Sequence, residues 1–110
     1  NALAHITGGG IKDNLKRVIP NALGFTINKN NLAFSKKNNI YYWLKNDCKI
    51  SEIELLKTFN CGLGMIIVIP KKEKDVLFQF CRKIKQPIQE VGEITANKKI
   101  AFFNKSAPNY

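Results

Sequence analysis

The sequence feature that most constrains the fold is an uninterrupted run of apolar residues from Met65 to Ile69, bounded by Gly64 and Pro70. The run is far shorter than the roughly 20 apolar residues of a membrane helix, but it has the length of a β-strand. Because no polar residue alternates with the apolar ones, the run predicts a strand that is buried on both faces. Proline offers no amide to a neighbouring strand, so we expect the strand to stop at Pro70.

Four stretches of the chain have the spacing of apolar residues that is typical of an amphipathic α-helix. They span residues 13–19, 40–47, 51–59 and 71–85. The third opens with Ser51-Glu52-Ile53-Glu54, a capping box in which the Ser51 hydroxyl accepts a hydrogen bond from the Glu54 amide. The apolar faces that we expect to be buried are Leu15, Val18 and Ile19; Ile40, Trp43 and Leu44; Ile53, Leu56 and Phe59; and Val76, Leu77, Phe80, Cys81 and Ile84.

Short strands and loops are predicted for the remaining segments. Residues 22–27 are predicted as a strand, and the polar residues 28–39 mainly as loop. Residues 88–94 and 99–103 are predicted to form a terminal hairpin that turns near Asn97, and the tail from Asn104 is expected to fray.

The order of these elements indicates an α+β fold, layered in the α/β manner, in which a mixed sheet carries packed helices. With 110 residues the chain has the length of one small domain with a modest core. The chain does not begin with methionine, and its first residues lack the basic and apolar segments of a signal peptide.

The formal net charge of +10 raises the question of an acidic partner such as a nucleic acid. Lysines outnumber arginines 16 to 2, although arginine is favoured where two hydrogen bonds recognise a phosphate. The lysines are also scattered, so we interpret them as a solvated surface. A small basic RNA-binding module is the alternative. It requires exposed aromatic residues, whereas Trp43, Phe59 and Phe80 lie on helix faces that we expect to be buried.

The three cysteines, Cys48, Cys61 and Cys81, are widely spaced, and His5 is the only histidine. A structural zinc site needs about four such ligands, so no metal site is expected. The odd number of cysteines also argues against a complete disulfide framework. A reducing, cytoplasmic compartment fits this pattern best.

Two glycine-rich segments are the candidates for a functional site. In Thr7-Gly8-Gly9-Gly10, backbone amides can approach an anion closely, and Arg17 in the following helix can reach the same anion. Asn60-Cys61-Gly62-Leu63-Gly64 lies between a predicted helix and the apolar strand, where Gly62 can end the helix. By spacing alone, both segments favour a tight structural turn over a ligand site. His5 directly precedes the first segment and is a candidate general acid or base.

Both segments lie in longer strings that resemble one known family. Residues 4–20 are similar to the AHITGGG…N-I/L-x-R-V-L/I-P segment of the aminoimidazole ribonucleotide synthetases, which are phosphoribosylformylglycinamidine cyclo-ligases. Residues 58–65, TFNCGLGM, resemble that family's TFNCGxGM string. Residues 40–44 and 91–94 also lie where the family has a helix ending in Trp-Leu and a C-terminal strand. The resemblance covers nearly the whole chain with the family's order and spacing.

The resemblance implies an ATP-dependent ligase of purine biosynthesis. In the implied reaction the formyl oxygen of formylglycinamidine ribonucleotide is phosphorylated, an amidine nitrogen attacks, and aminoimidazole ribonucleotide, ADP and phosphate are released. The implied site is a cleft for substrate and phosphate with His5 as the one catalytic candidate. Its lining residues would be Thr7, Gly8, Gly9, Gly10, Asn14, Arg17, Asn60, Gly62 and Gly64.

Because the family enzyme is much longer, the resemblance also implies that residues 1–110 are a fragment of its C-terminal domain and that the N-terminal ATP-binding domain is missing. The full-length enzyme would then use ATP and Mg²⁺ and form a cytoplasmic homodimer without nucleic-acid or membrane partners. The fragment alone would hold no ligand and be inactive. Other members of the superfamily, such as formylglycinamidine synthetase and selenophosphate synthetase, are the alternatives.

Overall fold

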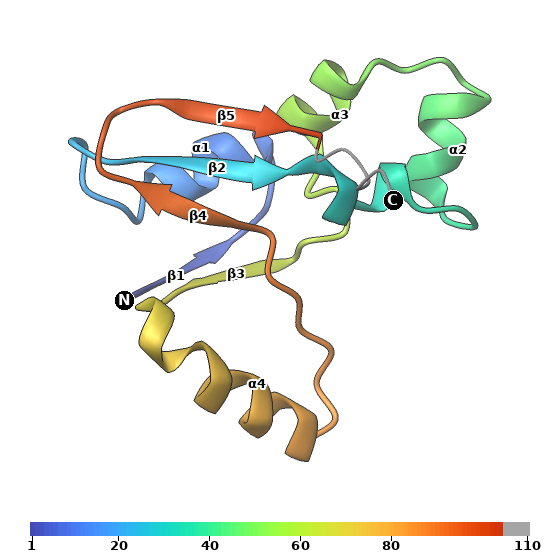
Figure 1. Ribbon diagram of the computed structural model, residues 1–110. Coiled ribbons are helices and arrows are strands. Elements are labelled where there is room, and N and C mark those ends of the chain that lie inside the picture. The colour runs from blue at the N-terminus through green and yellow to red at the C-terminus, as the bar shows by residue number, and fades with distance from the viewer. Residues whose placement is uncertain (105–110) are drawn as a thin grey trace, which may run out of the picture.

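The computed structural model describes residues 1–104, in which five strands and four α-helices form two small sheets with helices packed on them (Figure 1). The strands are β1 (Ala2–His5), β2 (Gly24–Asn28), β3 (Met65–Val68), β4 (Gly92–Thr95) and β5 (Ile100–Phe103). The α-helices are α1 (Gly10–Lys16), α2 (Ile40–Asn46), α3 (Glu52–Thr58) and α4 (Lys74–Lys83). Three 3₁₀ turns, η1 (Lys29–Asn31), η2 (Ala33–Ser35) and η3 (Lys71–Glu73), complete the chain. The predicted α+β class is confirmed, whereas most of the tail predicted to fray lies outside the described residues.

One sheet has the strand order β4-β2-β5, with β4 antiparallel and β5 parallel to β2. The predicted terminal hairpin is therefore wrong, because β2 lies between its two arms. Gly24 makes this arrangement possible: a Cβ there would lie 1.9 Å from the Lys99 carbonyl oxygen and 2.7 Å from that of Asn97. The connection from β4 to β5 thus crosses directly over the start of β2, and the Phe25 amide bonds the Lys99 carbonyl at 3.1 Å.

The other sheet is a two-stranded antiparallel ribbon of β1 and β3. Its inner face buries Ala4 and Ile66, while Leu3, Met65 and Ile67 on its outer face are 62%, 55% and 40% exposed. The prediction of a strand buried on both faces is therefore wrong for β3. An apolar run shows that a strand lacks polar residues, but whether both faces are covered depends on which elements pack there.

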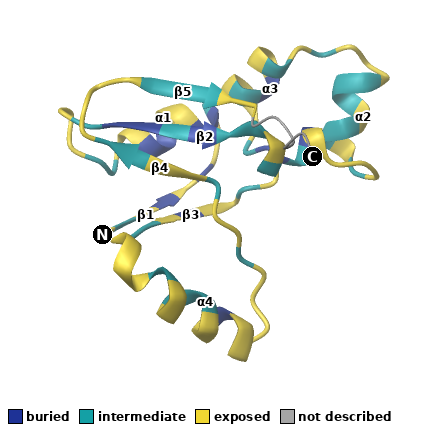
Figure 2. Cartoon of the chain, in the orientation of Figure 1, coloured by how far each residue is buried: buried dark blue, intermediate teal, exposed yellow. Residues whose placement is uncertain are grey.

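The core lies where α1, α3 and the inner faces of both sheets meet (Figure 2). Its least exposed members are Ile6, Ile11, Leu15, Phe25, Leu32, Phe34, Leu55 and Cys61. Two of these, Leu32 and Phe34, belong to the segment predicted as loop. That segment indeed lacks an α-helix or a complete strand, but its 3₁₀ turns hold both side chains inward.

Helices α2, α3 and α4 form close to where the sequence places them, whereas α1 spans Gly10–Lys16 and not the predicted residues 13–19. The buried faces of the helices also differ from the prediction. In α3 the buried residue is Leu55, while Ile53 is 66% exposed and Phe59 is 38% exposed. Trp43 of α2 is 50% exposed. The capping of α3 is as predicted, since the Ser51 hydroxyl accepts from the Glu54 amide at 3.2 Å.

Helix α4 lies apart from both sheets in Figure 1. Val76, Phe80 and Ile84 on its apolar stripe are 69%, 56% and 55% exposed, and of the predicted stripe only Cys81 is buried. Helical spacing identifies which side of a helix is apolar, but it does not supply a surface for that side to pack on. The expectation that Trp43, Phe59 and Phe80 are core residues is therefore wrong.

An ion-pair network joins η1, α2 and α3. Glu52 accepts from Lys45 of α2 at 2.6 Å and from Lys29 of η1 at 2.9 Å. The hydrogen bond from Lys45, more than that from Lys29, holds the pKa of the Glu52 carboxyl below its usual value, while partial burial opposes this shift. Within residues 1–104, none of the helices has the length and apolar character needed to cross a bilayer.

Candidate functional site

The pairing of β1 with β3 brings the two glycine segments to the same end of the ribbon. The first segment follows β1 and the second precedes β3, and antiparallel pairing places the end of one strand beside the start of the other. His5 lies opposite Met65, and the next amide, that of Ile6, donates to the Gly64 carbonyl at 2.9 Å. Residues almost 60 positions apart in the sequence are therefore neighbours in the fold.

The glycines of these segments divide into those that the fold requires and those that it does not. Gly9, Gly10 and Gly62 have φ angles of 94°, 76° and 91°, which disfavour any residue with a side chain. A Cβ on Gly10 would also lie 1.9 Å from the Leu56 carbonyl oxygen, so this glycine lets α1 pack closely against α3.

Gly8 and Gly64 differ from the other three. Neither has a positive φ, both are exposed, and a Cβ at either position would meet nothing within 4 Å. Nothing in residues 1–104 therefore explains why glycine stands there. Open space at glycine is the condition for a ligand to approach the backbone closely.

Asn14 holds the first glycine segment in shape from inside the protein. Its side chain is 5% exposed, and its Nδ2 lies 2.7, 3.3 and 3.2 Å from the carbonyl oxygens of Gly10, Gly8 and Thr7. Its Oδ1 accepts from the Thr7 hydroxyl at 3.4 Å. Three carbonyls of the loop thus point inward to one side chain.

Arg17, the C-cap residue of α1, reaches this loop through Asn14. One guanidinium nitrogen donates to Asn14 Oδ1 at 3.1 Å, and the side chain is otherwise exposed. A carboxylate also lies against the loop, because Asp13 Oδ2 is 3.2 Å from where a Cβ on Gly9 would be. The loop therefore has one cation and one anion at its rim.

His5 lies on the outer face of the ribbon, in register with Met65 and on the same side as Leu3 and Ile67. It is exposed, and no carboxylate, thiol or hydroxyl is hydrogen-bonded to it among the described residues. The structure thus brings His5 to the same end of the ribbon as Gly64 but pairs it with no catalytic partner.

The second segment is a tight turn that its own side chains stabilise. Asn60 Oδ1 accepts from the Gly62 amide at 2.9 Å and from the Tyr41 hydroxyl at 3.0 Å. The Cys61 thiol is fully buried and donates to the Leu55 carbonyl at 3.5 Å, and burial raises its pKa to about 11. A neutral, buried thiol is a poor nucleophile, so Cys61 acts in packing. The role of Tyr41 in α2 was not predicted, because helical spacing does not show that its hydroxyl reaches Asn60.

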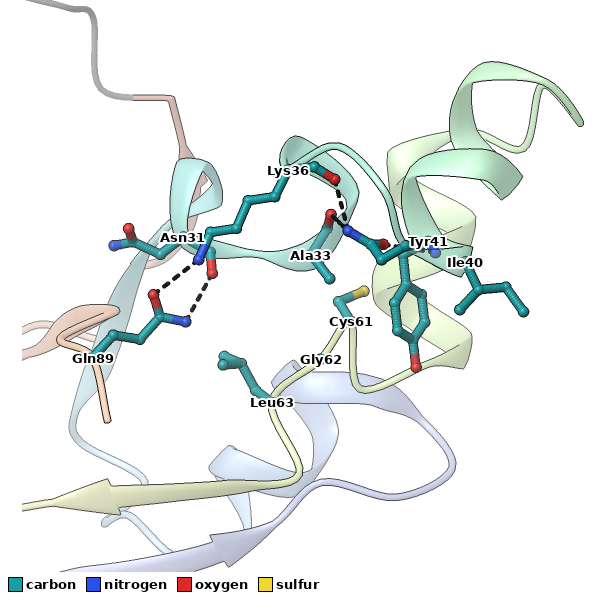
Figure 3. A pocket seen from close by; sticks show the side chains of 10 residues that line it. Asn31, Ala33, Lys36, Ile40, Tyr41, Cys61, Gly62, Leu63 and Gln89 are labelled. Carbon is teal, nitrogen blue, oxygen red and sulfur yellow. Dashed lines mark hydrogen bonds between the residues drawn. The ribbon is translucent and has the colours of Figure 1, made fainter. Parts of the chain in front are cut away.

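A shallow pocket of about 290 Å³ opens beside this turn (Figure 3). Cys61, Gly62 and Leu63 form one wall, and Tyr41 and Ile40 of α2 form another. Its polar side chains bond to one another: Gln89 accepts from Lys36 at 3.2 Å and donates to the Asn31 carbonyl at 3.0 Å. Both polar ends of the Gln89 side chain are therefore already paired within the protein. No cluster of His, Cys, Asp or Glu suited to a metal occurs in the part of the chain that the structure describes.

The two glycine segments lie within a match to a known protein family. The model of the family described as AIR synthase related protein, C-terminal domain, matches residues 1–105. The chain belongs to this family. The superfamily indicated by the two motif strings is thus confirmed, and the α+β fold agrees with it. The match does not separate the aminoimidazole ribonucleotide synthetases from the related enzymes, so the specific reaction stays a prediction.

Proposed function

We propose that this AIR synthase related domain forms the substrate side of an ATP-dependent cyclo-ligase, which converts formylglycinamidine ribonucleotide to aminoimidazole ribonucleotide in purine biosynthesis. The family occurs in ATP-utilising enzymes. The strings AHITGGG and TFNCGLGM favour the cyclo-ligase over formylglycinamidine synthetase and selenophosphate synthetase within it.

The observation that carries this proposal is the pair of glycines, Gly8 and Gly64, at one end of the ribbon. Each motif string contributes one glycine that neither the backbone conformation nor the packing requires. Among the described residues, the amides of Gly8 and Gly9 have no hydrogen-bond partner. Together with Arg17, they offer N–H donors to a phosphate, as phosphoryl transfer requires.

In the proposed reaction the γ-phosphoryl group of ATP passes to the formyl oxygen of the substrate, and ADP leaves. An amidine nitrogen then attacks the activated carbon, the carbon–oxygen bond breaks, and phosphate leaves with the formyl oxygen. The loop amides and Arg17 would stabilise phosphate charge during these steps. We propose that parts of the enzyme outside residues 1–104 hold the Mg²⁺ ion. We also propose that these parts supply the ATP site and a homodimer interface.

The test is substrate-dependent ADP release by the purified full-length protein. We expect release with formylglycinamidine ribonucleotide, and none with selenide or with formylglycinamide ribonucleotide and glutamine. Release with either of the latter would assign the protein to a relative and overturn the proposal. The isolated 110-residue chain is expected to release no ADP with any of these substrates.

RNA binding is a second candidate, because Trp43, Phe59 and Phe80 are exposed on a chain with a net charge of +10. Stacking on exposed aromatic residues and lysine contacts to phosphates would produce affinity that falls steeply with salt. A salt titration with single-stranded RNA separates the two candidates. We expect weak binding, and tight binding with a steep salt slope would favour this second function.

A further inference from the structure

We propose that Asn14 is a positioning residue, which turns the amides of the Thr7–Gly10 loop and the guanidinium of Arg17 toward a phosphate group of the ligand. This inference rests on the function proposed above. It assigns to Asn14 a task apart from packing, and it places that residue beneath the loop without direct contact to the substrate.

Asn14 buries a polar side chain in the core. Asn14 is the one buried polar residue in the part of the chain that the structure describes. An apolar side chain of the same size, such as leucine, would fill this position without the cost of desolvating an amide group. The polar group must therefore be explained by the hydrogen bonds that it makes.

The hydrogen bonds of Asn14 also fix which way its side-chain amide faces. The side-chain nitrogen of Asn14 faces the carbonyls of Thr7, Gly8 and Gly10, all of which are acceptors. Its oxygen faces the Arg17 guanidinium, which can only donate. The orientation of the Asn14 amide is thus fixed, because acceptors surround its nitrogen and a donor faces its oxygen.

The consequence for the loop follows from backbone geometry. Because successive carbonyls of the loop point inward to Asn14, the amides of Gly8 and Gly9 remain available on the other side. Gly8 itself is exposed with open space above its α-carbon. Asn14 also holds Arg17 at the same rim, because its Oδ1 accepts from the guanidinium.

The test replaces Asn14 in the full-length protein with aspartate. Asn14→Asp keeps the size of the side chain and an acceptor for Arg17, but it removes both N–H donors and puts an oxygen against three carbonyls. The matched control is Asn46→Asp in α2. Asn46 Nδ2 also donates to a carbonyl four residues earlier, that of Tyr42 at 2.9 Å, but it lies outside the proposed site.

The measurement compares the affinity for formylglycinamidine ribonucleotide with that for its dephosphorylated ribonucleoside. A general structural defect lowers both affinities, whereas a misplaced phosphate loop lowers only the first. We expect Asn14→Asp to reduce the nucleotide-to-nucleoside affinity ratio by roughly tenfold or more, as for a lost charge-assisted hydrogen bond, and Asn46→Asp to leave it unchanged.

Two outcomes support the inference and two overturn it. A reduced ratio assigns the loop to the phosphate of the substrate, whereas unchanged affinities for both ligands with a fall in kcat specific to Asn14→Asp assign it to the transferred phosphoryl group. If wild type binds the ribonucleotide and Asn14→Asp matches Asn46→Asp in both the ratio and kcat, Asn14 has no positioning role. If wild type does not bind the ribonucleotide at all, the proposed function fails and the inference fails with it.

Discussion

Alanine substitutions at Gly8 and Gly10, two glycines of the same loop, should have opposite effects on the free energy of unfolding. Gly8 has an ordinary φ and open space around its α-carbon, so Gly8→Ala should stabilise the fold by about 0.4–1 kcal/mol through the reduced freedom of the unfolded chain. Gly10 has a φ of 76° and would place a Cβ 1.9 Å from the Leu56 carbonyl oxygen. The left-handed conformation costs about 1–2 kcal/mol for a residue with a side chain, and the overpacking against α3 costs about 1–3 kcal/mol more.

Urea denaturation of the 110-residue chain measures both effects, with the fluorescence of Trp43, the only tryptophan, as the signal. With a slope near 1 kcal/mol per molar urea, Gly10→Ala should lower the midpoint by roughly 2 M or more, and Gly8→Ala should raise it by less than about 1 M. Far-UV circular dichroism confirms that each variant is folded at the start.

The same substitutions in the proposed full-length enzyme test the role of these glycines in catalysis. Gly8→Ala should lower kcat/KM although it leaves stability intact, because its methyl group occupies the space through which the ligand approaches the backbone. Equal destabilisation by Gly8→Ala and Gly10→Ala would refute the division of the glycines. Normal kinetics for a folded Gly8→Ala enzyme would refute the placement of the ligand.

Three further predictions follow from burial and charge. Leu55→Ala should destabilise the chain by about 2–5 kcal/mol and Ile53→Ala by less than about 0.5 kcal/mol in urea denaturation; the reverse order would show that α3 buries the face predicted from helical spacing. A thiol reagent at pH 8 should label Cys48 rapidly and Cys61 only after urea is added, since Cys61 is buried and its pKa is raised to about 11; rapid labelling of both would contradict this burial. Because the folded-state pKa of Glu52 lies below its usual value of 4.5, its ion pairs should stabilise the fold by less than about 1 kcal/mol at neutral pH, and this contribution should fade as the pH drops through 4.5 toward the lowered value. Glu52→Gln should remove that part of the pH dependence, and identical stability curves between pH 3 and 6 would show that the pairs contribute nothing.

Local rules account for much of what was predicted correctly about the fold. The helix spacing located α2, α3 and α4, and the capping box at Ser51 marked the start of α3. β3 ends at Val68, two residues before Pro70, which could not have continued the ladder of amide hydrogen bonds. The first helix was located less well, since α1 begins at Gly10 and not at Asp13. Its start depends on the packing of a glycine against α3, which has no signature in helical spacing.

The candidate site shows the same division. The two glycine motifs and the positions of Asn14 and Arg17 were visible in the sequence, and the family comparison agrees with the superfamily that they indicated. Their spatial relation was not visible, because the segments are far apart in the chain and meet only through the pairing of β1 with β3. The sequence also did not separate Gly8 and Gly64 from Gly10 and Gly62, since the difference lies in the dihedral angles and neighbours of each residue.

By itself, then, the sequence determined where regular structure forms and which segments carry the family's motifs, since both depend on residues close together in the chain. Tertiary structure alone decided which apolar faces are covered: the strand β3 and the apolar stripe of α4 were both expected to be buried, yet each leaves large apolar side chains exposed. It also decided that β2 lies between β4 and β5, because that order depends on the close approach of the Lys99 carbonyl to Gly24. Burial and strand order are properties of pairs of distant segments, and no single segment contains them.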